Sequence, residues 1–139
     1  MEEMETTGVT LDTDILIDLL RNVKTTVNFL TEMEVRRTIL CTTVINAFEL
    51  YHGAYRTKEQ EKNVLAVGRL LDKLFLLPLS LRSAETAARI YAELEKKDKP
   101  TDLRDALIGA VSIANKYPLA TRNVEHFRRI PGLTVIPTP

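Results

Sequence analysis

Three acidic side chains lie beside apolar segments of this sequence. Asp12 ends the strand-like run that begins at Gly8, Glu49 lies in the largely apolar segment "VINAFELYHG", and Asp105 directly precedes "ALIGAV". An unpaired charge inside a protein is very costly. Each of these carboxylates therefore needs a partner, and their separation in the sequence predicts that three different elements supply them.

A divalent cation is the partner that would satisfy all three acids at once. If Asp12, Glu49 and Asp105 converge, their mutual repulsion favours protonation, and a bound cation removes that conflict. The chain has only two histidines and one cysteine, so the ligands would be nearly all oxygen. Oxygen ligands select Mg²⁺ or Mn²⁺ over zinc. We therefore predict that these three residues hold Mg²⁺ or Mn²⁺ and act in catalysis.

Each acid also has a local explanation, which stays open at this point. Asp12 suits the N-cap of a helix, and Asp102, three residues before Asp105, imitates a capping box. Glu49 fits either an exposed edge or a pair with His52, three residues further along. Taken together, these single explanations do not account for acids on three elements of one fold.

Two further acids, Asp14 and Asp18, follow Asp12. They are four residues apart, which places them on one helix face. Asp14 either stabilises the first turn through the helix dipole or supports the metal site. We expect Asp18 to form a surface pair with Arg21.

The hydrophobic pattern predicts strands that alternate with helices. Alternation of this kind is typical of a parallel α/β sheet with helices on both faces, and ligands of such sheets bind at the carboxyl ends of the strands, where Asp12 falls. We expect one domain over 7–139, preceded by a flexible acidic tail over 1–6. The expected strands are 7–11, 39–42, 75–79, 118–121 and 133–136, and the main expected helices are 13–20, 25–35, 44–53, 57–74, 82–97 and 101–117, with a turn or short helix between the last two strands.

Composition excludes several classes of protein. Lys plus Arg and Asp plus Glu both number 19, so the net charge is zero and bulk charge points to no partner. The single Cys41 excludes an internal disulfide and a cysteine-based zinc cluster, and we expect it to be a small buried residue. There is no apolar signal segment and no run near the ~18 residues of a membrane span, so we expect a cytoplasmic protein without membrane contact.

Four segments resemble, in order, the signature blocks of the PIN-domain ribonucleases, and most closely those of VapC-like toxins of toxin–antitoxin pairs. They are "VTLDTDILIDLL", "TTVINAFELYHGA", "DLRDALIGAVSIA" and "PLATRNVEHFRRIPGLTVI". The resemblance implies a PIN-like three-layer α/β fold with a sheet of four to five strands. It also implies an acidic Mg²⁺ or Mn²⁺ site, hydrolysis of RNA phosphodiester bonds, a small antitoxin partner and a homodimer.

The same resemblance assigns roles to residues by position. The first, second and third family carboxylates fall on Asp12, Glu49 and Asp105. The fourth block places Asn123 where the family often has another acid, with His126 three residues on. Asn123 is therefore a candidate catalytic residue without a charge. Which residue takes the position of the family's fourth acid, here called the fourth corner of the site, stays open among Asn123, His126 and Glu125. Four residues are candidates for supporting the metal ligands: Asp14, Asp102, Thr121 and Glu125.

A local excess of basic residues lies beside the fourth block. "KYPLATRNVEHFRRIPG" contains Lys116, Arg122, Arg128 and Arg129 against one acid, Glu125. Phosphate contacts from such residues supply affinity without sequence choice. We predict that Arg122, Arg128, Arg129 and His126 contact RNA; the alternative is a solvated turn.

Two other functions compete with the nuclease. "DTDIL" half-resembles the nucleophile loop of haloacid-dehalogenase-like phosphotransferases, although Leu16 stands where that loop has Thr or Val. A catalytically weak PIN domain acting only as a binding module is suggested by the uncharged Asn123. For assembly, we predict a homodimer and a groove for an antitoxin segment, from an apolar surplus in the second to fourth helices: Phe29, Phe48, Tyr55, Leu65 and Leu70.

Overall fold

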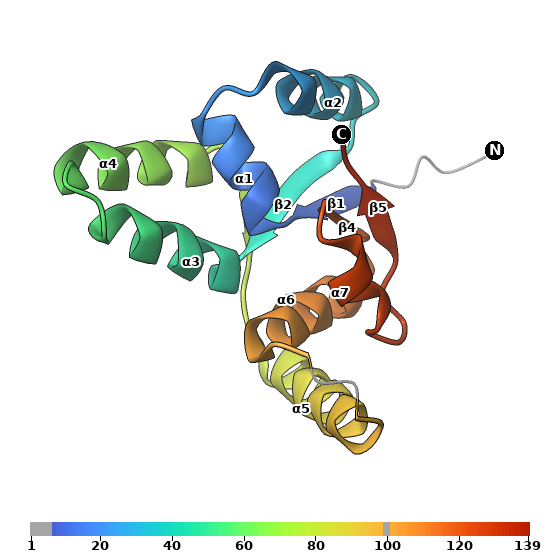
Figure 1. Ribbon diagram of the computed structural model, residues 1–139. Coiled ribbons are helices and arrows are strands. Elements are labelled where there is room, and N and C mark those ends of the chain that lie inside the picture. The colour runs from blue at the N-terminus through green and yellow to red at the C-terminus, as the bar shows by residue number, and fades with distance from the viewer. Residues whose placement is uncertain (1–6, 99–100) are drawn as a thin grey trace.

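Five parallel strands form a single sheet with helices on both faces (Figure 1). The computed structural model describes residues 7–98 and 101–139, so the predicted acidic tail lies outside the described residues. The strand order β3-β2-β1-β4-β5 confirms the predicted three-layer α/β architecture. The strands are β1 Gly8–Leu11, β2 Ile39–Thr43, β3 Phe75–Leu77, β4 Leu119–Thr121 and β5 Val135–Pro137.

Seven helices connect these strands within the described residues, close to their predicted positions. The third helix continues two residues beyond Gly53, because this glycine has open space around it and its backbone does not leave the helical conformation. The helices are α1 Thr13–Leu20, α2 Lys24–Val35, α3 Val44–Tyr55, α4 Gln60–Leu71, α5 Leu81–Lys96, α6 Leu103–Ala114 and α7 Val124–Arg128.

Two apolar clusters hold the layers together, one on each face of the sheet. On one face, Leu11 and Ile15 pack with Leu30, Leu50 and Val67 from the surrounding helices. The other cluster, formed with α5, α6 and α7, includes Ile90, Ile108, Val111, Leu119 and Phe127. Because helices cover both faces of the sheet, side chains on both sides of the central strand β1 are shielded, and all four of its residues are buried.

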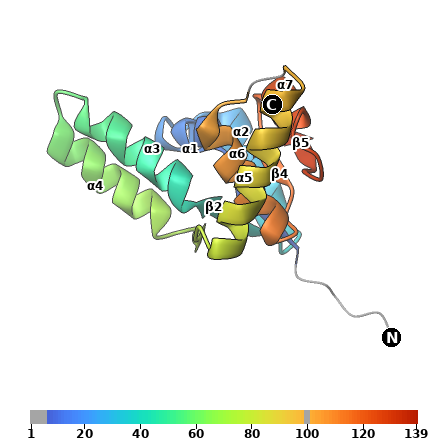
Figure 2. The same ribbon diagram turned by 90° about the horizontal axis from the view of Figure 1, so that it is seen from below.

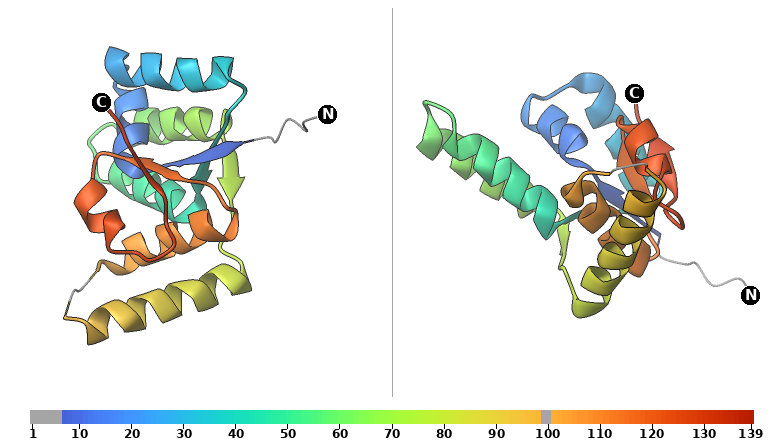
Figure 3. Two further views of the ribbon diagram at one scale, coloured as in Figure 1. Left: turned by 90° about the vertical axis from the view of Figure 1, so that its right-hand side faces the viewer. Right: turned by 60° about the horizontal axis from the view of Figure 1, so that its bottom comes forward.

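Three helices, α1, α3 and α7, begin shortly after the carboxyl ends of β1, β2 and β4. α5 lies outside α6, on the side away from the sheet (Figure 1). α3 and α4 run side by side as a hairpin that extends away from the α5–α6 pair (Figure 2, Figure 3). The starts of α1, α3 and α6 therefore lie near one edge of the sheet. Asp12 is the residue before α1, Asp105 lies in the first turn of α6, and Glu49 lies one turn further along α3.

Cys41 is buried in the second cluster, as predicted, and burial raises the pKa of its thiol to about 11. No helix in the described part of the chain is both long enough and apolar enough to cross a membrane.

Candidate active site

Asp12 lies where β1 ends and α1 begins, and it is 7% exposed. Its Oδ1 accepts a hydrogen bond from the backbone N–H of Thr13 at 2.8 Å, so the expected N-cap role is real. Its Oδ2 accepts a second bond from the hydroxyl of Thr121 at 2.7 Å. The carboxylate is therefore fixed by two strands and one helix, with its orientation set from both sides.

The surroundings of Asp12 raise the pKa of its carboxyl from 3.8 to about 6. Desolvation is the largest cause, and the charges of Asp14 and Asp105 add to it. The hydrogen bond from Thr121 opposes the shift. Neighbouring carboxylates that raise one another's pKa favour the binding of a cation, because its charge relieves their mutual repulsion.

Asn46 joins the first two acidic elements, and the sequence alone did not identify it. It is fully buried, and its Nδ2 donates to Thr13 Oγ1 at 2.9 Å and to Asp12 Oδ1 at 3.3 Å. Its Oδ1 accepts from the hydroxyl of Thr43 at 2.7 Å, within the capping box that starts α3. The three-residue spacing from Thr43 to Asn46, just before an apolar helix, was the available signal.

Glu49 lies one helical turn after buried Ile45 and is half-buried. Its Oε1 accepts from the hydroxyl of Thr13 at 2.9 Å, and its Oε2 lies 3.3 Å from Nη1 of Arg104. The suggested pairing with His52 is wrong, because the His52 ring stacks on Phe48 with 5.9 Å between ring centroids.

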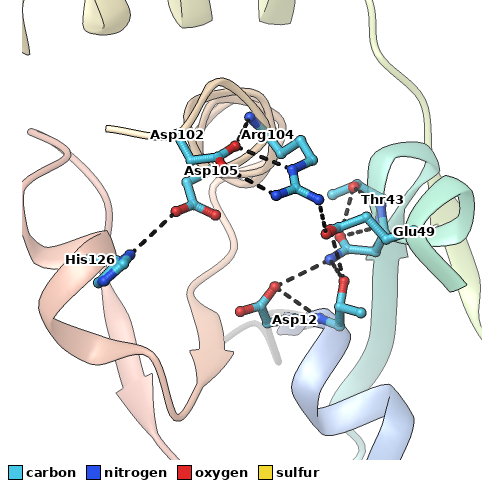
Figure 4. Close-up of polar contacts among 9 residues, drawn as sticks. Asp12, Thr43, Glu49, Asp102, Arg104, Asp105 and His126 are labelled. Carbon is cyan, nitrogen blue, oxygen red and sulfur yellow. Dashed lines mark hydrogen bonds and ion pairs between the residues drawn. The ribbon is translucent and has the colours of Figure 1, made fainter. Parts of the chain in front are cut away.

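Asp102 and Asp105 occupy the start of α6, as predicted (Figure 4). Asp102 is the N-cap, and its Oδ1 accepts from the backbone N–H of Arg104 at 2.7 Å. Asp105 is half-buried, and the pKa of its carboxyl is raised by burial first and by the charge of Asp102 second. His126 from α7 approaches this acid, with 3.8 Å between its Nδ1 and Asp105 Oδ2. Asp12, Glu49 and Asp105 thus lie near one another on three different elements (Figure 4), close enough that Asp105 adds to the raised pKa of Asp12 and Glu49 adds to that of Asp105.

The structure separates the three candidates for the fourth corner. Asn123 is the exposed N-cap of α7, and its backbone N–H donates to Thr121 Oγ1 at 3.0 Å. Glu125 is exposed and lies 3.5 Å from Nη1 of Arg128. His126 is the one of the three whose side chain reaches a predicted metal ligand, since it lies beside Asp105.

Asp18 does not form the expected surface pair with Arg21. It is buried, and its Oδ2 accepts from the Thr26 hydroxyl at 2.6 Å and from the guanidinium of Arg122. The hydrogen bond from Arg122 is the main reason that the pKa of Asp18 lies below its ordinary value. The reason is packing: the α1 face that carries Asp14 and Asp18 lies against the loop after β4, where the backbone N–H of Arg122 also donates to Asp14 Oδ2 at 3.0 Å.

The predicted basic patch is divided by β4. Arg122, Arg128 and Arg129 follow the carboxyl end of that strand, whereas Lys116 precedes its amino end at the opposite edge of the sheet. Arg128 and Arg129 are exposed, and Arg122 is engaged with Asp18. Only the part of the patch after β4 is placed beside the acids.

The donor set suits a hard cation, although the ligands are not gathered around one point. Carboxylate oxygens from Asp12, Glu49 and Asp105 are ligands that Mg²⁺ and Mn²⁺ prefer. Among residues 7–98 and 101–139, no three Asp, Glu, His or Cys side chains are close enough to enclose an ion as they stand. Glu49 instead bonds to Thr13 and Arg104.

A groove of about 360 Å³ opens beside these acids, between α1, α3 and α4. Thr13 and Glu49 line one part of it, and the rest is largely apolar. The apolar lining residues are Ile17, Leu20, Leu50, Gly53, Ala54, Ala66 and Val67.

Comparisons with known proteins agree with this geometry. The PIN domain family model matches residues 9–133. Ribonuclease VapC of Rickettsia bellii is 35% identical over 94 residues, which cover 66% of this chain and 70% of that protein. The tRNA(fMet)-specific endonuclease VapC of Salmonella typhimurium is 28% identical over 96 residues, with 69% and 73% coverage.

Solved structures share the whole fold. VapBC2 from Rickettsia felis, bound to a DNA fragment from its promoter, matches with a TM-score of 0.89 and 24% identity over 96% of this chain and 100% of that one. DNA-bound VapBC from Salmonella typhimurium matches with a TM-score of 0.85 and 25% identity over 95% and 98%.

Proposed function

This chain belongs to the PIN-domain family, and on that premise we propose that it is a metal-dependent endoribonuclease of the VapC type, the toxin of a toxin–antitoxin pair. The observation that carries the proposal is that Asp12, Glu49 and Asp105 lie near one another although each comes from a different element. The related VapC proteins are named as ribonucleases, which supports RNA as the substrate class.

Mg²⁺ or Mn²⁺ would be held by Asp12, Asp105 and Glu49. A cation there supplies an activated water and a Lewis acid for the phosphate oxygens. The protein's own groups orient these ligands: Thr121 and Asn46 fix the carboxylate of Asp12, and Thr13 holds Glu49. Burial first, and then the charges of Asp14 and Asp105, raise the pKa of Asp12 to about 6, so a bound cation would favour the ionised form of this carboxyl.

RNA would approach from the side of the loop after β4. His126, Arg128 and Arg129 lie on α7 or directly after it and are exposed, and Arg122 is partly exposed. Contacts from such groups to phosphates would position the strand without reading its sequence.

A cognate antitoxin is the partner that the VapBC neighbours support, and we propose that it occupies the groove between α1, α3 and α4. The groove has a largely apolar lining, with one acid, Glu49, and one base, Arg21, among its polar residues, and such a lining suits an amphipathic segment with charged side chains at its edges. We further propose a homodimer, because Phe48, Tyr55 and Leu65 are more than half exposed. Phe29 and Leu70 pack partly against the core and contribute less to that surface.

The nuclease proposal is tested by removing one charge at a time. Asp12→Asn, Glu49→Gln and Asp105→Asn should each reduce Mg²⁺-dependent RNA cleavage by at least about 100-fold, since the loss of a metal ligand removes both the water activation and the Lewis acid. Asp72→Asn and Glu85→Gln, both exposed and on other elements, are the matched controls. Full activity in any of the three variants would remove that residue from the site.

The same assay separates the rival functions. A purified wild-type protein that folds, binds an antitoxin and does not cut RNA would favour a binding module. A phosphotransferase would instead retain covalent phosphate on Asp12. That rival is disfavoured because Leu16, which is completely buried in the core, stands where the phosphotransferase loop has Thr or Val.

A further inference from the structure

Arg104 places a cation from the chain itself on the acids of the candidate site (Figure 4). Its Nη1 lies 3.3 Å from Glu49 Oε2, while its Nε and Nη2 each lie 3.2 Å from the carboxylate oxygens of Asp102. The side chain therefore spans from the first turn of α6 to the middle of α3. One guanidinium neutralises parts of both acidic elements.

The two partners hold Arg104 in different ways. Asp102 is anchored as the N-cap of α6, and it binds two nitrogens of the guanidinium as well as the backbone N–H of the same residue. Glu49 receives a single, longer contact from Nη1. If Glu49 turns to another cation, Asp102 keeps the guanidinium at the mouth of the site.

A metal ion and a guanidinium compete for the same carboxylate. Two cations on Glu49 would repel each other, so a metal that takes this oxygen releases Nη1 of Arg104. The freed group is planar and presents paired N–H donors, which match the oxygens of a phosphate. The side chain of Arg104 is 55% exposed, so a polynucleotide can reach it.

We propose that Arg104 is a substrate-phosphate ligand that pairs with Glu49 while the metal is absent and turns to an RNA phosphate when the metal binds. This inference rests on the proposed nuclease function. It distinguishes Arg104 from Arg122, whose guanidinium is committed to a buried acid, Asp18.

The proposal predicts opposite effects of one substitution on two ligands. In Arg104→Gln, the competitor for Glu49 is lost, so Mn²⁺ should bind the metal-free protein about 2- to 5-fold more tightly, the range of an exposed ion pair. RNA should bind the Mg²⁺-loaded protein about tenfold more weakly, the range of a lost charge-assisted hydrogen bond. The slope of log affinity against log salt should become shallower by about 0.7, as for one phosphate contact on a single strand.

Two measurements give these values without relying on turnover. Calorimetry follows Mn²⁺ binding to the metal-free protein. Stopped-flow anisotropy follows a fluorescein-labelled, mixed-sequence single-stranded RNA in Mg²⁺ before it is cut. Arg104→Lys keeps the charge but not the paired donors, so it should keep the wild-type salt slope while recovering only part of the RNA affinity. Arg89→Gln, exposed on α5, is the control.

Three results would overturn the inference. Weaker Mn²⁺ binding in Arg104→Gln would mean that the arginine positions Glu49 for the metal. Unchanged RNA affinity would exclude a phosphate contact, and a salt slope in Arg104→Lys as shallow as that in Arg104→Gln would show that charge at this position does not reach the RNA. Thermal melting checks the fold of each variant. We expect little change, because the bond from the backbone N–H of Arg104 to Asp102 does not involve the substituted side chain. If the wild-type protein bound neither Mn²⁺ nor RNA, the proposed function itself would fall, which is a different outcome from these three.

Discussion

The hydroxyl of Thr121 donates to Asp12 Oδ2 at 2.7 Å, and this bond joins the carboxyl ends of the neighbouring strands β4 and β1. Thr121 Oγ1 in turn accepts a hydrogen bond from the backbone N–H of Asn123 at 3.0 Å. One threonine therefore fixes both the first predicted metal ligand and the start of α7.

Thr121→Val removes this bond with almost no change in volume. Because the bond lowers the pKa of Asp12, its loss should raise that pKa further above about 6. Mn²⁺ should therefore bind the metal-free protein about threefold or more weakly at pH 6, and less so at pH 8, where Asp12 stays ionised. The pH profile of Mn²⁺ affinity measures this. Thr10→Val, which loses a buried bond to Ser112 away from the acids, should leave the profile unshifted.

Asp12→Asn and Asp18→Asn should change stability in opposite directions. The pKa of Asp12 is raised on folding, so its contribution to stability is present below about pH 4 and is lost as the pH rises through about 6. Asp12→Asn should therefore stabilise the metal-free protein at pH 7.5, by up to about 3 kcal/mol.

Asp18 has a lowered pKa, so its contribution is present above about pH 4 and is lost at lower pH. Asp18→Asn should destabilise the protein by about 1–3 kcal/mol at pH 7.5, since the guanidinium of Arg122 loses its partner. Urea unfolding in a chelator measures both variants. A shift of the same sign in the two would contradict the assignment of Asp12 as a strained buried charge.

His126→Asp should tighten Mg²⁺ binding more than Asn123→Asp does. His126 lies beside Asp105, so an acid at this position adds charge close to a predicted ligand, whereas Asn123 is the exposed N-cap of α7. Calorimetric titration of the metal-free proteins compares them, with Glu125→Gln as a control that should change little. A larger gain in Asn123→Asp would place the fourth corner at the cap.

Gly53 lines the groove, and a Cβ added there would meet no atom within 4 Å. Gly53→Ala should stabilise the protein by about 0.5–1 kcal/mol, because glycine is unfavourable inside a helix. Gly53→Phe should fill the groove instead. Co-purification with the cognate antitoxin should survive the alanine variant and fail in the phenylalanine variant. Binding that survives both would move the antitoxin to another surface.

Phe48 is 62% exposed on α3, and we expect it to lie in the dimer interface. Light scattering at tens of micromolar, roughly the range of weak association, should give twice the 15.7 kDa chain mass for the wild-type protein. Phe48→Glu should shift the mass towards the monomer. Val35→Glu, at an exposed apolar position on α2, should not. A wild-type monomer would count against the dimer.

The sequence by itself determined the order of strands and helices, because hydrophobic period and capping residues act over a few neighbours. It also singled out Asp12, Glu49 and Asp105 as candidate metal ligands, although Asp12 caps α1 as well. Helix ends were less certain: Gly53 predicts a helix end, yet α3 continues past it, since glycine permits a helix stop without requiring one.

The tertiary structure decided which polar groups meet. Asp18 bonds to Arg122, 104 residues away, rather than to nearby Arg21, and Arg104 reaches Glu49 across 55 residues. Such pairs depend on the angle at which helices pack on the sheet and on the direction in which long side chains leave the backbone. Neither quantity is contained in a local pattern, because both are set only when the apolar faces on the two sides of the sheet are buried together.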